Sequence, residues 1–118
     1  MATASPPVVE RFLDALRARD FDAIGSCFDA DAMLVAVVPP GIREDSGPDE
    51  ITARYRRWLD DGVATVPEAE AMPFSDLTRI RYVVEAADAT VFEQTAYAEV
   101  EADRIVRVRV ACSGHRPL

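Results

Sequence analysis

The first half of the chain carries apolar residues at helical spacing. Over residues 8–16, and again over residues 21–28, apolar side chains recur every three or four positions, which predicts two amphipathic helices. Pro6 and Pro7 suit the start of the first helix, because proline has no N–H group to leave unpaired there. The acidic stretch at residues 29–31 is expected to end the second helix.

A short strand is predicted to separate these helices from a third one. Residues 33–38 are continuously apolar and stop at Pro39-Pro40-Gly41, as a buried strand would. The polar residues 42–47 are expected to form a loop, and a helix then begins at Pro48. The predicted apolar face of this third helix consists of Ile51, Tyr55, Trp58 and Leu59.

From residue 63 onward, apolar residues recur at every second position, and no longer at every third or fourth. Alternation predicts strands at residues 63–74, 77–84, 90–101 and 104–112, with a hairpin turn at residues 101–104 between the last two. Three helices with one early strand, followed by a run of antiparallel strands, indicate an α+β fold. At this length we expect residues 1–118 to form a single domain.

The composition narrows the function classes. Hydrophobic residues make up 49% of the chain, so it should fold, and a formal net charge of −8 argues against binding nucleic acid or anionic membranes. No apolar run is long enough to span a bilayer, and we expect a cytoplasmic protein. Cys27 and Cys112 match no metal-ligand spacing, so reduced thiols and no metal or other cofactor are expected.

Three stretches of sequence together cover nearly the whole chain: VVERFLDALRARDFDAIGSCFDADAML, PPGIREDSGPDEITARYRRWL and VEADRIVRV. They resemble the nuclear transport factor 2-like superfamily, which includes ketosteroid isomerases, SnoaL-type polyketide cyclases, limonene epoxide hydrolase and scytalone dehydratase. The resemblance implies a cone-shaped α+β barrel, in which a strongly curved, mainly antiparallel sheet packs on three helices. It also implies a pocket at the open end of the cone and a homodimer.

The residues on which ketosteroid isomerases depend are mostly absent. The position of their general base is Val38 here, and their oxyanion-hole tyrosine corresponds to Phe12. Their second oxyanion donor falls near Gln94 or Thr95, and only Tyr55 corresponds to a supporting tyrosine. The first strand also lacks the Tyr and Asn of the epoxide hydrolases, and one histidine cannot supply the paired histidines of scytalone dehydratase. The resemblance therefore predicts the fold without these activities.

Gln94 is the most informative single residue. It interrupts an apolar strand face, so its carboxamide is expected to point inward and must find hydrogen-bond partners. It is either a core residue satisfied by neighbours or a polar anchor for a ligand. We predict a hydrogen bond between Tyr55 and Gln94, with Tyr82 on the same inner face and Trp58 belonging mainly to the core.

His115 is the only histidine, and two interpretations of it remain open. In the first it is an exposed residue of the C-terminal tail. In the second, residues 112–114 turn the chain at the mouth of the cone and place His115 over the pocket as an acid or base.

The sequence thus leaves two main hypotheses. The first is a protein with a pocket for a small apolar organic ligand. If it is an enzyme, the reaction would be cofactor-free isomerisation, cyclisation or elimination next to a carbonyl, and the candidate catalytic residues are Tyr55, Gln94 and His115. The candidate substrate-binding residues are Phe12, Val38, Trp58, Tyr82, Val108 and Cys112. The second is a non-catalytic ligand-binding or protein-interaction module. A third possibility is a partner subunit that assembles through the strand face bearing Arg107 and Arg109; we also expect a homodimer through this outer sheet face.

Overall fold

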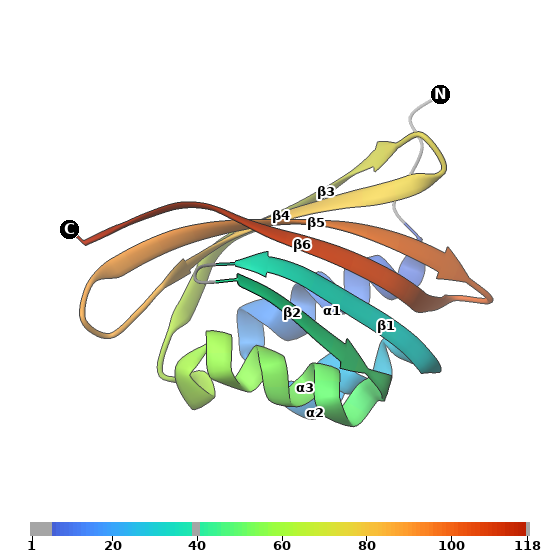
Figure 1. The fold of residues 1–118 in the computed structure, drawn as a ribbon, viewed down its shortest axis with the longest axis horizontal. Coiled ribbons are helices and arrows are strands. Elements are labelled where there is room, and N and C mark those ends of the chain that lie inside the picture. The colour runs from blue at the N-terminus through green and yellow to red at the C-terminus, as the bar shows by residue number, and fades with distance from the viewer. Residues whose placement is uncertain (1–5, 39–40, 118) are drawn as a thin grey trace.

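The computed structural model places three helices against one face of a six-stranded sheet (Figure 1). It describes residues 6–38 and 41–117, with side chains for all of these except residues 38 and 113–117. The elements in chain order are α1 (Pro7–Ala18), α2 (Phe21–Ser26), β1 (Phe28–Val38), β2 (Gly41–Ser46), α3 (Gly47–Trp58), the one-turn helix η1 (Asp60–Gly62), β3 (Thr65–Phe74), β4 (Leu77–Glu85), β5 (Thr90–Glu101) and β6 (Arg104–Pro117).

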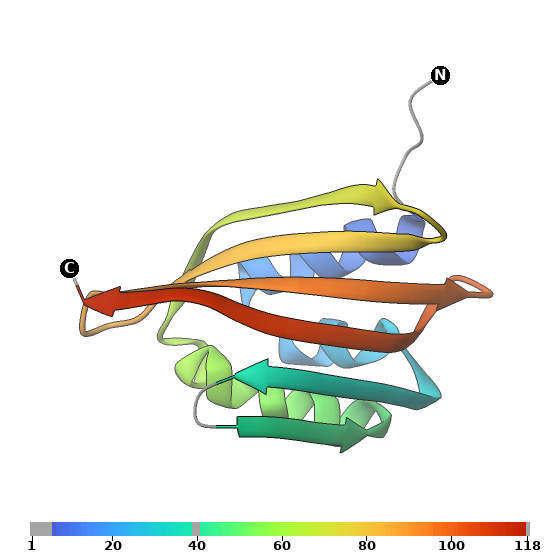
Figure 2. The same ribbon diagram turned by 45° about the horizontal axis from the view of Figure 1, so that its top comes forward.

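The strand order across the sheet is β2-β1-β6-β5-β4-β3, as Figure 2 shows from the outer face. All neighbours are antiparallel except β1 and β6, which run parallel. The sheet bends over the helices and leaves β2 and β3 as free edges, so it curves like a cone without closing into a full barrel. The predicted α+β class and curved, mainly antiparallel sheet are confirmed.

Local sequence explains where the helices begin and end. Proline occupies the start of α1, and Arg19 ends it in the left-handed conformation at φ 52°. Asp20 then caps α2 by accepting a hydrogen bond from the Ala23 N–H at 3.1 Å. At the start of α3, Glu50 reaches back to accept a hydrogen bond from the Ser46 N–H at 2.8 Å.

Two predictions about the first half of the chain are wrong. Residues 42–47 were expected to form a loop, yet residues 41–46 form β2, which pairs with β1 along its whole length. As an edge strand it buries little of either face, so it carries polar residues and shows no apolar alternation. The acidic residues 29–31 do not follow α2 as a helix end but lie inside β1, since backbone pairing extends to Phe28.

The concave face of the sheet and the inner faces of the helices form the core. Along β5, alternate side chains are buried as predicted, beginning with Gln94, Ala96 and Ala98. The end of β1, the C-terminal end of α3, the β4–β5 loop and the end of β6 all lie at the left in Figure 1. Here the long arm of the sheet extends beyond the helices, which makes this the open end of the cone.

Candidate functional site

Three strands bring polar side chains into one row on the concave face. The register pairs Tyr82 of β4 with Gln94 of β5, and Gln94 in turn with Cys112 of β6. Directly opposed residues on adjacent strands have Cβ atoms about 5 Å apart, so these three side chains are immediate neighbours. Tyr82 and Gln94 are 0% and 1% exposed, whereas Cys112 is half-buried.

Tyr82, not Tyr55, is the hydrogen-bond partner of Gln94. The Tyr82 hydroxyl donates to Oε1 of Gln94, so the predicted bond between Tyr55 and Gln94 is wrong. The reason is register: Tyr82 stands directly beside Gln94 in the sheet, while Tyr55 approaches from α3. Alternation along the two strands places Tyr82 and Gln94 on the same face, but their direct pairing follows from the register in which Glu85 pairs with Val91.

Tyr55 brings a second buried hydroxyl to this row. It lies on the inner face of α3, is 0% exposed, and its Oη has no hydrogen-bond partner among the described residues. Its ring packs edge-on against Phe12 and Trp58, with centroids 5.6 and 5.1 Å away, and lies 6.5 Å from the ring of Tyr82. The helix therefore holds the Tyr55 ring firmly while its hydroxyl remains available.

Both phenols are held in their protonated form. Burial raises the pKa of Tyr55, and the neighbouring Tyr82 hydroxyl offsets this only in part. Burial also raises the pKa of Tyr82, with a further contribution from the proximity of Tyr55. At neutral pH these groups are hydrogen-bond donors and cannot serve as bases.

The other candidate residues lie at different distances from this row. Phe12 is buried and Trp58 is half-buried, and the rings of both pack against Tyr55. Val108 pairs with Ala98 and lies four residues along β6 from Cys112, roughly 13 Å at 3.3 Å per residue. It is buried in the core away from the polar row.

Val38 and His115 have side chains outside the described part of the structure. Val38 is the last residue of β1. The turn at residues 112–114, on which the second interpretation of His115 depended, is not formed, because β6 continues to Pro117 and the backbone at His115 pairs with Phe92. A register shift between Phe92 and Glu93 takes the place of the turn.

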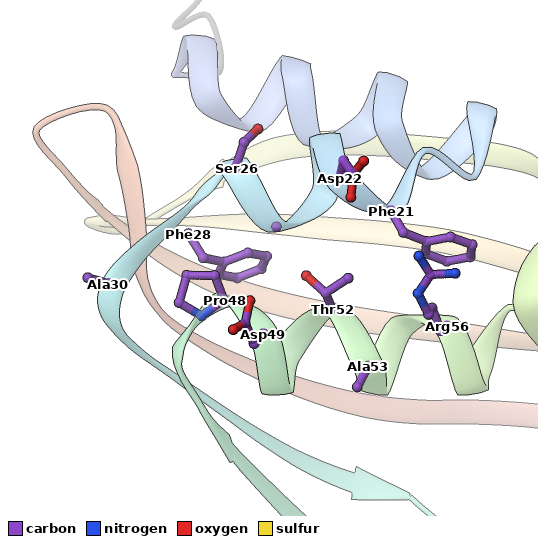
Figure 3. Close-up of a pocket in the computed structure, with 11 residues that line it drawn as sticks. Phe21, Asp22, Ser26, Phe28, Ala30, Pro48, Asp49, Thr52, Ala53 and Arg56 are labelled. Atoms are coloured by element: carbon purple, nitrogen blue, oxygen red, sulfur yellow. The ribbon is translucent and has the colours of Figure 1, made fainter.

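Sequence reasoning missed a groove on the outside of the helices, between α2, α3 and the start of β1 (Figure 3). Its volume is about 560 Å³, and its walls include the carboxylates of Asp22 and Asp49. At one end the Arg56 guanidinium lies 4.5 Å from the centre of the Phe21 ring. The helices approach closely because Gly25 has no Cβ, which would lie 2.6 Å from Thr52 Oγ1.

Within residues 6–38 and 41–117, no three or more His, Cys, Asp and Glu side chains are grouped so that they could hold a metal ion. Over the same residues, no helix is long and apolar enough to cross a membrane.

A comparison with known families now decides the family. Residues 9–108 match the SnoaL-like domain. The chain belongs to that family. No curated protein matches this SnoaL-like domain.

Solved structures with the same fold include proteins of different proposed or known activities. A proposed polyketide cyclase from Sinorhizobium meliloti superimposes with a TM-score of 0.71 at 20% identity, over 90% of this chain and 94% of that one. An LEH-like epoxide hydrolase from M. tuberculosis gives 0.69 at 19%, over 92% and 81%. A proposed ketosteroid isomerase from Kribbella flavida gives 0.73 at 11%, over 96% and 81%. These likenesses establish the nuclear transport factor 2-like, ketosteroid isomerase-like fold of this SnoaL-like domain, as the sequence predicted, and do not extend to activity.

Proposed function

We propose that this SnoaL-like domain binds a small, mostly apolar organic molecule inside its cone and holds an oxygen of that molecule with Tyr55 and Gln94. The observation that carries the proposal is the Tyr55 hydroxyl, which is fully buried and has no partner among the described residues. Leaving such a group unsatisfied costs about 1–3 kcal/mol. A ligand oxygen placed beside the hydroxyl would remove this cost.

The reaction that these groups suit best is cofactor-free chemistry next to a carbonyl: isomerisation, cyclisation or elimination. A neutral phenol and a carboxamide can polarise a carbonyl by hydrogen bonding, and this stabilises the negative charge that develops on its oxygen. A base is also needed. Asp45, a buried carboxylate on the inner side of the sheet, is held by Arg54 at 2.8 Å. Because this ion pair already occupies Asp45, we propose His115, whose backbone on β6 pairs with Phe92 of β5, as the proton carrier.

A non-catalytic ligand-binding or protein-interaction module is the alternative. It is favoured by the apolar Val38 at the base position of the isomerases and by the near-complete burial of Tyr55, Tyr82 and Gln94. A ligand can reach these groups only when side chains at the open end move. The half-buried Trp58 lies at the end of α3 in contact with Tyr55, so a movement of its side chain would open a path to the Tyr55 hydroxyl.

The proposal includes a second copy of the chain as a partner, bound through the outer sheet face. Support comes from Val37 and Ile42, which are paired across β1 and β2 and are 60% and 64% exposed. The low cysteine content of the sequence supports the cytoplasm as its location.

Titration of the labelled protein with 1-indanone and with indane, followed by NMR, tests the binding site. The two probes have nearly the same shape, and only the first carries a carbonyl. We expect 1-indanone to bind about tenfold more tightly than indane, to shift the Gln94 side-chain resonances, and to lose this advantage in Tyr55→Phe. Tyr97→Phe is the matched control, because Tyr97 lies on the opposite face of β5. Equal affinities for the two probes, or shifts confined to the α2–α3 groove, would refute the site.

The same probe separates the enzyme from the binder. A catalyst of chemistry next to a carbonyl should accelerate the exchange of the C2 protons of 1-indanone for deuterium in D₂O. Binding without faster exchange would favour the non-catalytic alternative.

A further inference from the structure

The two ends of the Gln94 carboxamide offer opposite chemistry to a ligand. Oε1 accepts hydrogen bonds and the Nε2 group donates them, so the ligand that fits depends on which end faces it. Gln94 is 1% exposed, and a buried carboxamide cannot exchange protein partners for water at little cost. Its orientation must therefore be set by a neighbouring side chain.

Tyr82 is the neighbour that can set it. Its hydroxyl has a single proton and donates it to Oε1 of Gln94. The Nε2 group then lies on the far side of the carboxamide from Tyr82. Cys112, the neighbour of Gln94 on the other strand, carries a thiol, which is only a weak donor and acceptor and cannot fix an amide in the same way.

The surroundings keep the Tyr82 hydroxyl protonated and in place beside Gln94. Burial raises its pKa well above the ordinary value for tyrosine, so it remains protonated throughout the neutral range. The sheet register places it directly opposite Gln94, and its ring is fully buried among core side chains. The contact is therefore part of the fold and does not depend on a flexible side chain.

We propose that Tyr82 is a positioning residue that holds the Gln94 carboxamide with its N–H groups turned toward the ligand, so that the site selects molecules with an oxygen acceptor and discriminates against N–H and O–H donors. This rests on the proposed function, because it concerns the ligand held by Tyr55 and Gln94. It adds a residue that does not touch the ligand and a rule for which ligands are rejected.

The test compares three probes of similar shape: 1-indanone as an acceptor, indole as a donor and indane as neither. Affinities for the wild type, Tyr82→Phe and Tyr97→Phe are measured by NMR titration. In the wild type we expect 1-indanone to bind about tenfold more tightly than indole. In Tyr82→Phe the amide can turn over, so the ratio should fall to near one while the affinity for indane is unchanged. Tyr97→Phe should behave as the wild type.

Each other result has a distinct meaning. If Tyr82→Phe weakens all three probes equally, or leaves the ratio as it was, Tyr82 has only a structural role and the inference fails. If the wild type binds none of the probes, the proposed function fails for this ligand class.

A readout on the free wild-type protein then decides the inference without any ligand. Strong NOEs from the Gln94 amide protons to Cys112 and weak ones to Tyr82 are expected. The reverse pattern would place Nε2 beside Tyr82 and overturn the inference, even if the Tyr82→Phe protein did not fold.

Discussion

Tyr55 and Tyr82 are both fully buried tyrosines, and they differ in what their hydroxyls do. The Tyr82 hydroxyl satisfies Gln94, whereas the Tyr55 hydroxyl has no partner among the described residues. A buried polar group without a partner destabilises the free protein, so its presence is understandable if it serves a ligand.

This contrast predicts opposite effects of the same substitution at the two positions. Tyr55→Phe should leave the free energy of unfolding unchanged or raise it by about 1 kcal/mol, because it removes an unsatisfied hydroxyl. Tyr82→Phe should lower it by about 1–3 kcal/mol, because Oε1 of Gln94 loses its donor. Urea unfolding of both variants measures the difference. A loss of more than about 1 kcal/mol in Tyr55→Phe would mean that this hydroxyl does have a partner.

The raised pKa values of the same tyrosines predict how stability depends on pH. The unfolded chain releases tyrosine protons near pH 10, while folded Tyr55 and Tyr82 hold theirs to higher pH. Above about pH 10 the unfolded state therefore binds fewer protons, and stability falls as pH rises. Burial also raises the pKa values of the Cys27 and Cys112 thiols, so they contribute in the same range, and the comparison of the wild type with Tyr55→Phe is what isolates Tyr55. Urea unfolding at pH 9 and at pH 11 should show a loss of stability over this interval that is smaller by about 1.4 kcal/mol in total in Tyr55→Phe. Equal losses would contradict the raised pKa of Tyr55.

At the scale of elements, the β5–β6 turn caps the first helix. Ala102 and Asp103 both have positive φ, at 51° and 55°, as a two-residue hairpin turn requires. Asp103 then accepts a hydrogen bond from the Val8 N–H at 2.9 Å and another from Arg11 at 3.1 Å. One carboxylate thus fixes the start of α1 to the far end of the sheet from the polar row.

Replacing Asp103 should loosen this connection. Asp103→Ala removes the acceptor for the Val8 N–H and places alanine at positive φ, so we expect a loss of about 1–2 kcal/mol in the free energy of unfolding. Asp103→Asn is the matched control, since asparagine tolerates positive φ and can still accept from an N–H. It should lose less than half as much. Equal losses in urea unfolding would show that the charge, not the cap, matters.

The elements that the sequence predicts best are those with one buried face. The periodicity over α1, α3 and β4 to β6 reflects a packed side opposite a solvated one, and it located these elements. Strand β2 escaped prediction because an edge strand with polar residues on both faces leaves no hydrophobic pattern. Residues 41–46 form a strand because they pair with β1, and the sequence of these residues alone does not reveal that pairing.

For the candidate site, the sequence predicted which way Gln94 points but not which residue it contacts. The inward direction of Gln94 followed from alternation along its strand, and its burial is confirmed. Its partner depended on the register between β4 and β5, which alternation alone leaves uncertain. The α2–α3 groove depends on how closely two helices approach at Gly25, a tertiary feature without a periodic signal.

At the scale of the whole molecule, the outer sheet face is the surface that the fold leaves uncovered, as Figure 2 shows. Near one edge it carries the exposed pair Val37 and Ile42. Toward the other edge Glu68 and Glu70 surround Arg81, while β6 between them presents Arg107 and Arg109. A two-fold axis through this face would bring the acidic side of one copy toward the basic strand of the other.

The proposed homodimer predicts which substitution should separate the two copies. Ile42→Asp places a charge in the apolar pair, where burial against a partner would leave the charge without compensation. We expect the wild type to sediment as a dimer and Ile42→Asp as a monomer with an unchanged fold by circular dichroism. Val63→Asp is the matched control, because Val63 is equally exposed, at 61%, but follows η1 and lies off the sheet face. A stable dimer of this kind buries about 1,200–2,000 Å² in total, so an uncompensated charge buried in its apolar part should shift the equilibrium strongly. A wild type that sediments as a monomer at every concentration would leave the outer face without its second copy, and dissociation by Val63→Asp would place the contact at the open end of the cone instead.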